Sequence, residues 1–323
     1  MTQTIALEFE DNSQAQLLFG ELHSNLTYLE KKLGVSIADR GNSLSISGTK
    51  LDVKNTKFIL ESLYKKLEER TLDDVSPSHI DTELRFIKSP ELRKRKKMPD
   101  PEENNKAAIK TKVKTIAPRS PTQAAYLKSI AQHDMVFGLG PAGTGKTYLA
   151  VAAGVDMFLQ GKVDRLIFCR PAVEAGENLG FLPGDMREKI DPYIRPIYDA
   201  LHDMMPWDFM MKRMEAGDIE IAPLAFMRGR TLANSFVLLD EAQNSTCAQM
   251  KMFLTRMGEN SRLVITGDLS QTDLPKGVKS GLNEAVDILS NIQEIQFTEF
   301  TVKDVIRHSL VQKIISAYDK ATD

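Results

Sequence analysis

The sequence predicts an α/β protein whose larger part is a parallel β-sheet with helices on both faces. Four short apolar runs with few charges, at residues 135–138, 165–169, 236–239 and 262–266, are typical of strands buried on both faces. Helical patterns separate these runs, and strands that alternate with helices build parallel sheets. A smaller region that mixes strands and helices differently precedes them. The sequence therefore predicts a small α+β domain followed by an α/β domain.

Length and composition fit two globular domains. The chain has 323 residues, of which 42% are hydrophobic and 27% charged, and its formal net charge is −2. No apolar run approaches the ~18 residues that cross a bilayer, and the start MTQTIALEFEDNSQ lacks the pattern of a signal peptide. Two cysteines are too few for a disulfide scaffold or a cysteine zinc site. We therefore expect a cytoplasmic protein without membrane contact.

Residues 1–75 are expected to form the small α+β domain. Alternating apolar residues predict a strand over residues 4–9, and leucines on one helical face predict a single helix that begins near Asp11 and ends at Gly34. A Gly-Asn pair at residues 41–42 indicates a hairpin between two short strands. A second helix over about residues 53–67 completes the domain.

Residues 76–118 are expected to be a linker. Prolines interrupt this stretch, and between residues 85 and 119 there are 12 Lys or Arg against 4 Asp or Glu. Such a concentration of positive charge is typical of a segment that neutralises several phosphates of a nucleic acid at once. A solvated tether explains the composition equally well. The second domain then covers residues 119–323.

The strongest motif is a glycine-rich loop, GPAGTGKT, between the first apolar run and a helical pattern. It fits G-x-x-x-x-G-K-[ST], the P-loop whose backbone N–H groups surround the phosphates of a nucleotide at a helix N-terminus. Lys146 is expected to reach the β- and γ-phosphate oxygens, and the Thr147 hydroxyl to bind Mg²⁺. The predicted nucleotide-binding residues are Gly140, Pro141, Ala142, Gly143, Thr144, Gly145, Lys146 and Thr147.

A second motif, FVLLDEAQ, supplies two neighbouring acids. Asp240 stands at the carboxyl end of a predicted buried strand, the edge at which open parallel sheets bind ligands. We expect Asp240 to hold Mg²⁺ through a water molecule, and Glu241 to accept a proton from the attacking water as a general base. A solvated acid at the start of a loop is the plain alternative for Glu241. Because the pair activates water, it favours hydrolysis over transfer of the phosphoryl group to another acceptor.

Two glutamines are further candidates. Gln271 follows the last apolar run in TGDLSQTDLP, and we expect it to sense the γ-phosphate and orient water, although a Gly-Asp turn after a strand is common. Gln123 opens a helix before the P-loop strand, and its amide can donate to and accept from an adenine edge at once. An exposed glutamine at a helix start fits Gln123 equally well.

Together these motifs carry a resemblance. GPAGTGKT, FCRPAVEAGENLGFLPGD, MRGRTL, LLDEAQN, TGDLSQTDLP and DVIRHSLV are similar to segments of the PhoH-like family of ATPases, over nearly all of residues 119–323. The resemblance implies a RecA-like core, similar to the first motor domain of superfamily-one helicases, that binds and hydrolyses ATP. The first domain resembles the KH-like domain of bacterial members, although its G-x-x-G clamp is present only as GELH at residues 20–23.

Two functions are consistent with this resemblance. The first is an Mg²⁺-dependent ATPase that acts on RNA, in RNA remodelling, RNA processing or ribosome maturation. The second is a nucleotide-dependent adaptor with little intrinsic ATPase activity that docks a separate RNA-processing nuclease or the ribosome. The intact pair of acids favours the enzyme, whereas the single motor domain and the altered clamp favour the adaptor.

Residues 119–323 leave room for one motor domain, whereas superfamily-one helicases use an arginine from a second domain. We therefore expect an arginine from another subunit or from a folded-back C-terminal segment, with Arg307 as the candidate and a surface ion pair as its alternative. A homo-oligomer, such as a ring with ATP at subunit interfaces, follows from this expectation. Arg170, Arg228 and Arg230 are candidates either for contact with RNA or for pairing with a carboxylate.

Overall fold

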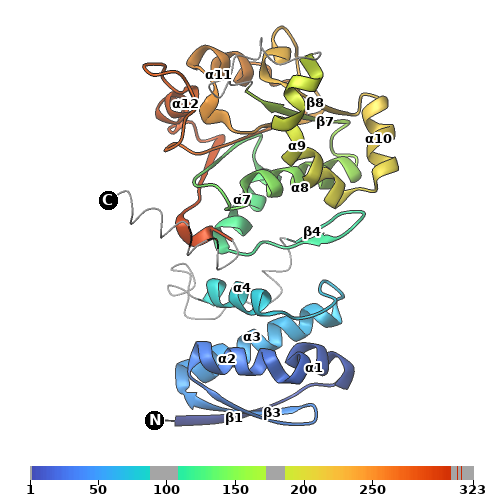
Figure 1. Cartoon of the computed structure of the whole chain (residues 1–323), viewed down its shortest axis with the longest axis vertical. Coiled ribbons are helices and arrows are strands. Elements are labelled where there is room, and N and C mark those ends of the chain that lie inside the picture. Colours follow the sequence, from blue (N-terminus) through green and yellow to red (C-terminus); the bar gives the residue numbers. More distant parts are fainter. Residues whose placement is uncertain (1, 88–107, 172–185, 307–310, 312–313, 315–323) are drawn as a thin grey trace. The chain divides into compact units, whose positions relative to one another are not determined.

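The computed structural model describes residues 2–87, 108–171, 186–306, 311 and 314, with backbone only for residues 186–193. The chain forms two compact units (Figure 1). The first contains the residues up to 108 together with 117–121, and the second contains residues 109–116 and those from 122 onward. Among the described residues, no helix combines the length and the apolar character that crossing a bilayer requires.

The first unit is an antiparallel sheet in the order β1-β3-β2, packed against helices. Its core contains fully buried side chains from the helices and the sheet, such as Leu29, Ile46 and Ile59. Its relation to KH domains stays a prediction. Its elements are β1 (Thr2–Glu8), α1 (Asn12–Phe19), η1 (Glu21–His23), α2 (Ser24–Leu33), β2 (Ser36–Arg40), β3 (Ser43–Thr49), α3 (Lys50–Glu68) and α4 (Pro77–Ile87).

The helix predicted between residues 11 and 34 is in fact two helices. α1 ends at Gly20, and Leu22 and His23 both adopt left-handed backbone conformations, with φ of 51° and 58°, before α2 continues. A Cβ at Gly20 would lie 2.7 Å from the Asn25 side chain, so this corner requires glycine. The apolar spacing continues across the break, which is why the leucine pattern alone does not reveal it.

A second difference concerns the predicted linker. α4 is a regular helix that packs on α2 and α3, so the first unit extends beyond residue 75. A short hairpin, β4 (Ile109–Lys110) with β5 (Thr115–Ile116), belongs to the second unit. Its turn places Lys112 Nζ 3.5 Å from the centre of the Phe209 ring, and Lys114 Nζ 2.6 Å from Asp203 Oδ2. These two lysines of the basic stretch therefore have partners within the chain.

The second unit is a six-stranded parallel sheet in the order β11-β6-β10-β9-β7-β8. The four predicted strands are present, while β8 and β11 are additional. Both additional strands lie at the edges of the sheet and contain polar residues, so they lack the continuous apolar runs of the central strands. The strands are β6 (Met135–Leu139), β7 (Arg165–Arg170), β8 (Ile219–Pro223), β9 (Ser235–Leu239), β10 (Arg262–Gly267) and β11 (Ile295–Glu299).

Helices cover both faces of this sheet. Alternate strand residues enter two separate cores: Phe168 and Phe236 pack with α7, α8, α9 and α10, whereas Ile167 and Val237 pack with α11 and α12. This is the parallel sheet with helices on both faces that the sequence predicts. Because its strands are parallel, their carboxyl ends all lie on the same side of the sheet, and polar residues follow them there. The helices are α7 (Pro121–Gln132), α8 (Lys146–Leu159), α9 (Met186–Met204), α10 (Trp207–Glu215), α11 (Cys247–Leu254) and α12 (Gly281–Leu289).

Candidate functional site

The P-loop joins β6 to α8. Gly140, Gly143 and Gly145 have φ of 137°, 83° and 84°, a backbone conformation that other residues rarely adopt. A Cβ at Gly140 would also collide with the carbonyl oxygen of Phe300. Beyond β11, Ile306 N–H donates to Gly143 O at 3.0 Å, so the segment after the last strand lies against the loop. These contacts fix the curled shape that a phosphate-binding loop needs.

Lys146 begins α8, and its ammonium lies inside the loop. Nζ donates to Gly140 O at 2.6 Å and to Pro141 O at 3.0 Å. Burial lowers the pKa of Lys146, while the nearby carboxylates of Glu241, Asp240 and Asp268 act in the opposite direction. The Lys146 ammonium therefore donates to loop carbonyls here, whereas the sequence predicts that it donates to phosphate oxygens. Phosphate oxygens are charged and are stronger acceptors than carbonyl oxygens.

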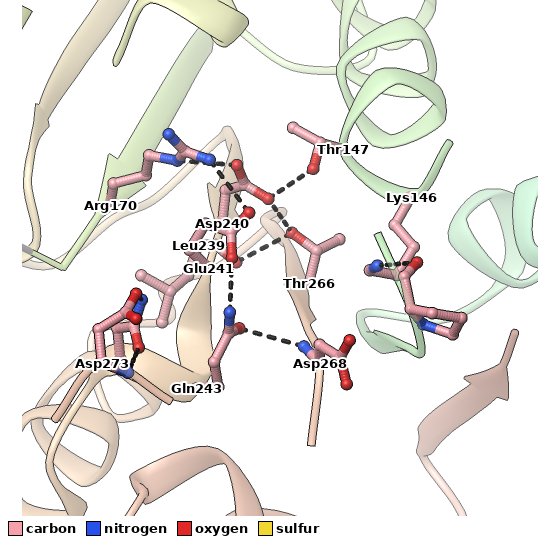
Figure 2. Close-up of polar contacts among 12 residues, drawn as sticks. Lys146, Thr147, Arg170, Leu239, Asp240, Glu241, Gln243, Thr266, Asp268 and Asp273 are labelled. Atoms are coloured by element: carbon pink, nitrogen blue, oxygen red, sulfur yellow. Dashed lines mark hydrogen bonds and ion pairs between the residues drawn. The ribbon is translucent and has the colours of Figure 1, made fainter. Parts of the chain in front are cut away.

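Asp240 lies at the end of β9, buried, and accepts three hydrogen bonds (Figure 2). The hydroxyls of Thr147 and Thr266 donate to Oδ1 at 2.6 and 2.7 Å, and Arg170 Nε donates to Oδ2 at 2.9 Å. The structure therefore brings together Thr147 and Asp240, which the two sequence motifs predicted as metal ligands. β10 lies between β6 and β9, so the loops that follow these two strands converge over it.

The Thr147 and Asp240 oxygens fit a magnesium site. Adjacent oxygens around an octahedral Mg²⁺ lie about 3 Å apart, since each metal–oxygen bond is about 2.1 Å long. Thr147 Oγ1 and Asp240 Oδ1 are 2.6 Å apart, so a small change would allow both to bind one ion. Hydroxyl, carboxylate and phosphate oxygens are the hard ligands that Mg²⁺ prefers.

Glu241 is held in an unusual position. It has left-handed backbone geometry, with φ of 53° and ψ of 40°, which costs a non-glycine residue about 1 kcal/mol or more. Arg170 Nη2 lies 3.2 Å from its Oε1, and Gln243 Nε2 lies 2.5 Å from its Oε2. The side chain is nevertheless 45% exposed. The carboxylate is therefore oriented by two donors and remains accessible to water.

A cavity of about 540 Å³ opens beside the two acids. α8 and α9 form its other walls, and the Tyr148 hydroxyl donates to Asp203 Oδ2 there at 3.2 Å. This cavity provides water with access to Glu241. Its lining includes Thr147, Tyr148, Arg170, Asp199, Asp203, Asp240 and Glu241.

The segment after β10 is only partly directed into the site. Asp268 is buried, and its Oδ1 accepts from both the backbone N–H and the hydroxyl of Ser270, at 2.9 and 2.6 Å. Its Oδ2 has no hydrogen-bond partner among the described residues. Gln271 is exposed, and within the described chain its side chain makes no hydrogen bond. Its expected role at the γ-phosphate stays a prediction.

Gln123 and Arg307 also stay predictions. Gln123 is buried rather than exposed. Its Nε2 donates to Thr144 O at 2.9 Å, so the side chain stabilises the backbone of the P-loop. A role in adenine selection requires the same amide to reach the base. Arg307 lies outside the described residues, directly after Ile306.

Three polar residues at this edge were not assigned to the site from the sequence. Thr266 and Gln243 are contained in the motifs TGDLSQTDLP and LLDEAQN, but only the packing of β9 beside β10 shows that they face the acids. Arg170 pairs with carboxylates, the second of its two interpretations, and so does Arg230, whose two terminal guanidinium nitrogens each donate to a Glu220 carboxylate oxygen at 2.7 Å.

Comparisons with known proteins agree with these motifs. The family model described as PhoH-like protein matches residues 115–319. A PhoH-like protein of Bacillus subtilis (strain 168) is 47% identical over 97% of this chain and 96% of its own length, and one of Mycobacterium tuberculosis (strain ATCC 25618 / H37Rv) is 45% identical over 93% and 84%. The Pif1 helicase structure from Candida albicans matches with a TM-score of 0.33 and 16% identity, over 61% of this chain and 42% of that one. The extent and identity of the sequence matches show that the chain belongs to the PhoH-like family.

Proposed function

We propose that the chain is an Mg²⁺-dependent ATPase that acts on RNA. The observation that supports this most strongly is the approach of Thr147 Oγ1 to Asp240 Oδ1, at 2.6 Å, with Glu241 directly beside them. A P-loop, a metal-binding pair and an adjacent acid are together what hydrolysis of a nucleoside triphosphate requires. RNA as the target rests on the family resemblance of the motifs.

Binding of the triphosphate exchanges contacts that already exist within the loop. The ammonium of Lys146 leaves Gly140 O and Pro141 O for phosphate oxygens, and the loop N–H groups with the start of α8 complete the anion site. Because the ammonium is already largely buried, little further desolvation accompanies this exchange. Binding to a phosphate therefore gains most of the charge-assisted hydrogen bond.

The two acids, Asp240 and Glu241, would have separate roles in hydrolysis. Thr147 and Asp240 would hold Mg²⁺, which neutralises charge on the phosphates when it is bound. Glu241, oriented by its two donors and accessible from the cavity, takes a proton from the attacking water. Thr266 keeps the Asp240 carboxylate in place through its hydroxyl.

A nucleotide-dependent adaptor is the second candidate function. The contact of Arg170 with both Asp240 and Glu241 favours it, because a guanidinium that neutralises both acids opposes metal binding and base catalysis. In this form the chain binds nucleotide, turns it over slowly and docks a nuclease or the ribosome. The enzyme remains the first proposal since Glu241 is open to water.

We further propose that the active form is a homo-oligomer. The single parallel sheet has no second motor domain beside it in the described chain, so an arginine that completes the site would come from a neighbouring copy or from the chain's own folded-back C-terminal segment, and the oligomer takes the first of these two sources. Light scattering in the presence of Mg²⁺ and a non-hydrolysable ATP analogue is expected to show a multimer. A monomer under these conditions would overturn this proposal.

Phosphate release tests the proposed ATPase. We would compare the wild type with Lys146→Ala, Glu241→Gln and the control Glu220→Gln, with and without single-stranded RNA. Lys146→Ala should lose nucleotide binding, whereas Glu241→Gln should keep it while the rate falls at least ~100-fold. Glu220 pairs with Arg230 at the neighbouring strand, so its substitution should leave the rate within ~2-fold.

The outcomes separate the two candidates. A wild type that binds ATP without releasing phosphate, with or without RNA, supports the adaptor and rejects the enzyme. Phosphate release that RNA does not change keeps the ATPase and rejects RNA as its activator. Equal rates for Glu241→Gln and the wild type would reject Glu241 as the general base.

A further inference from the structure

One buried side chain connects the loops that follow β9 and β10. Gln243, in the short turn η4 (Ala242–Asn244), uses both ends of its amide (Figure 2). Its Nε2 donates to Glu241 Oε2 at 2.5 Å, and its Oε1 accepts the backbone N–H of Asp268 at 3.1 Å. The amide thus links the acid after β9 to the backbone after β10.

The surroundings leave Gln243 little freedom. Ser280 donates its hydroxyl to the Gln243 backbone carbonyl at 2.8 Å. Next to the amide, a Cβ at Gly267 would lie 2.6 Å from Gln243 Oε1 and 2.5 Å from a methyl carbon of Leu282, so only glycine leaves room for the amide there. A side chain that is 3% exposed, with both ends bonded, has one well-defined orientation.

Both partners of Gln243 belong to parts of the site that a bound phosphate would affect. The Glu241 side chain is 45% exposed, so its two donors, Arg170 and Gln243, are what direct the carboxylate. Asp268 directly follows Gly267, whose carbonyl oxygen accepts the backbone N–H of Gly140 in the P-loop at 3.0 Å. A shift of the Asp268 backbone would therefore move the Gln243 amide and, through it, the Glu241 carboxylate.

We propose that Gln243 is a positioning residue that orients the Glu241 carboxylate and couples its orientation to the backbone at Asp268. The inference rests on the proposed ATPase function. Without the Nε2 donor, Arg170 would be the donor to this carboxylate that remains among the described residues, and its guanidinium would draw the carboxylate toward β7. Loss of the donor should then slow the hydrolytic step and leave nucleotide binding intact, because within the described chain Gln243 makes no hydrogen bond to the P-loop.

The neighbouring residue offers a matched control. Asn244 connects the same two loops: its Nδ2 donates to Asp273 Oδ2 at 3.1 Å and its Oδ1 accepts Asp273 N–H at 2.8 Å. Q243E and N244D each keep the acceptor, lose the donor and bring a second negative charge toward an acid. They differ in the acid concerned, which is Glu241 for one and Asp273 for the other.

The experiment compares kcat, KM for ATP and affinity for a fluorescent ADP analogue in wild type, Q243E, Q243M and N244D. We expect kcat to fall about 10-fold or more in both Gln243 variants, with nucleotide affinity within ~2-fold, and to stay within ~2-fold in N244D. Thermal unfolding verifies that each variant is folded, and if one Gln243 variant does not fold the other decides. In a Glu241→Gln background, Q243E should cause no further loss.

Other results would overturn the inference. Equal losses in Q243E and N244D would mean that the amide only holds two loops together, as would a loss that appears in KM rather than kcat. An additive loss in the Glu241→Gln background would mean that Gln243 does not act through Glu241. If the wild type has no ATPase activity, the proposed function and this inference are both rejected. If the wild type is active and Q243E has the same kcat, this inference alone is rejected.

Discussion

Each unit of the described chain contains a buried ion pair, and the two pairs differ in their surroundings. In the first unit, Lys66 Nζ lies 2.5 Å from Glu83 Oε1, with the side chains 13% and 0% exposed. In the second unit, Arg170 Nε lies 2.9 Å from Asp240 Oδ2, with 16% and 2% exposed. Glu83 Oε2 has no hydrogen-bond partner within the described residues, whereas both Asp240 oxygens accept hydrogen bonds.

We interpret the first as a structural pair and the second as a pair at the proposed nucleotide site. Lys66 and Glu83 join α3 to α4, and the Glu83 side chain is fully buried between these helices. Arg170 and Asp240 lie at strand ends beside a cavity, where a bound cation can take over the role of the guanidinium. Removal of the cationic partner should therefore lower the stability of either unit, but a bound ligand should restore stability only in the second.

The largest effect is expected for Lys66→Ala. This substitution leaves the fully buried Glu83 carboxylate without its cation, which typically costs about 3 kcal/mol or more. Urea unfolding, with hydrogen exchange of α3 and α4 as a local readout, measures the loss. Lys57→Ala is the control, since the Lys57–Glu61 pair on the same helix is about half exposed at 48% and 46%. If Lys66→Ala costs no more than Lys57→Ala, burial of the pair does not determine its contribution.

Arg170→Ala should have the next largest effect, about 2 kcal/mol in the nucleotide-free protein, because Glu241 shares the loss and is partly solvated. Mg²⁺ with a non-hydrolysable ATP analogue should then raise the melting temperature more in this variant than in the wild type, since the bound Mg²⁺ would place a positive charge beside Asp240 where the guanidinium is missing. Arg230→Ala is the control: its bidentate pair with Glu220 is 30% and 34% exposed, so its loss should be smaller and independent of nucleotide. Equal ligand-induced shifts in all three proteins would contradict the comparison.

Those parts of the candidate site that are formed by consecutive residues could be predicted from the sequence. The glycines and Lys146 form one continuous loop, and Asp240 ends an apolar run, so both could be predicted together with the four central strands. The convergence of Thr147 with Asp240 follows from the general rule for ligands at strand ends. The strand order that places them 2.6 Å apart is visible only in the structure.

The remaining features depend on pairings that the sequence does not show. Arg170 is 70 residues from Asp240, and an arginine after a strand fits an RNA contact as well as an ion pair. Gln243 is a polar residue within an unremarkable turn until Asp268 is placed beside it. The break at Gly20 interrupts a regular leucine spacing, because the tertiary contacts of Asn25 outweigh the local helical preference.

The smallest effect is expected for the exposed pair that joins the β4–β5 turn to α9. Lys114 Nζ lies 2.6 Å from Asp203 Oδ2, and the side chains are 42% and 50% exposed. The hydrogen bond from Lys114 is the main reason that the pKa of Asp203 lies below its ordinary value of 3.8. A carboxyl with a lowered pKa stabilises the folded state above the ordinary value, and this contribution is lost as the pH falls through the folded-state pKa.

Asp203→Asn should therefore cost less than about 1 kcal/mol near neutral pH, as exposed pairs do, and the difference from the wild type should shrink as the pH falls below about 4. Urea midpoints of both proteins across this range, at low and high salt, measure the change. High salt should also reduce the difference, because solvent screens a pair this exposed. A cost that is independent of pH and salt would assign the contribution to the Tyr148 hydrogen bond on the same oxygen rather than to charge. In that case burial would no longer explain why the three pairs differ, and packing around each acid would have to replace it.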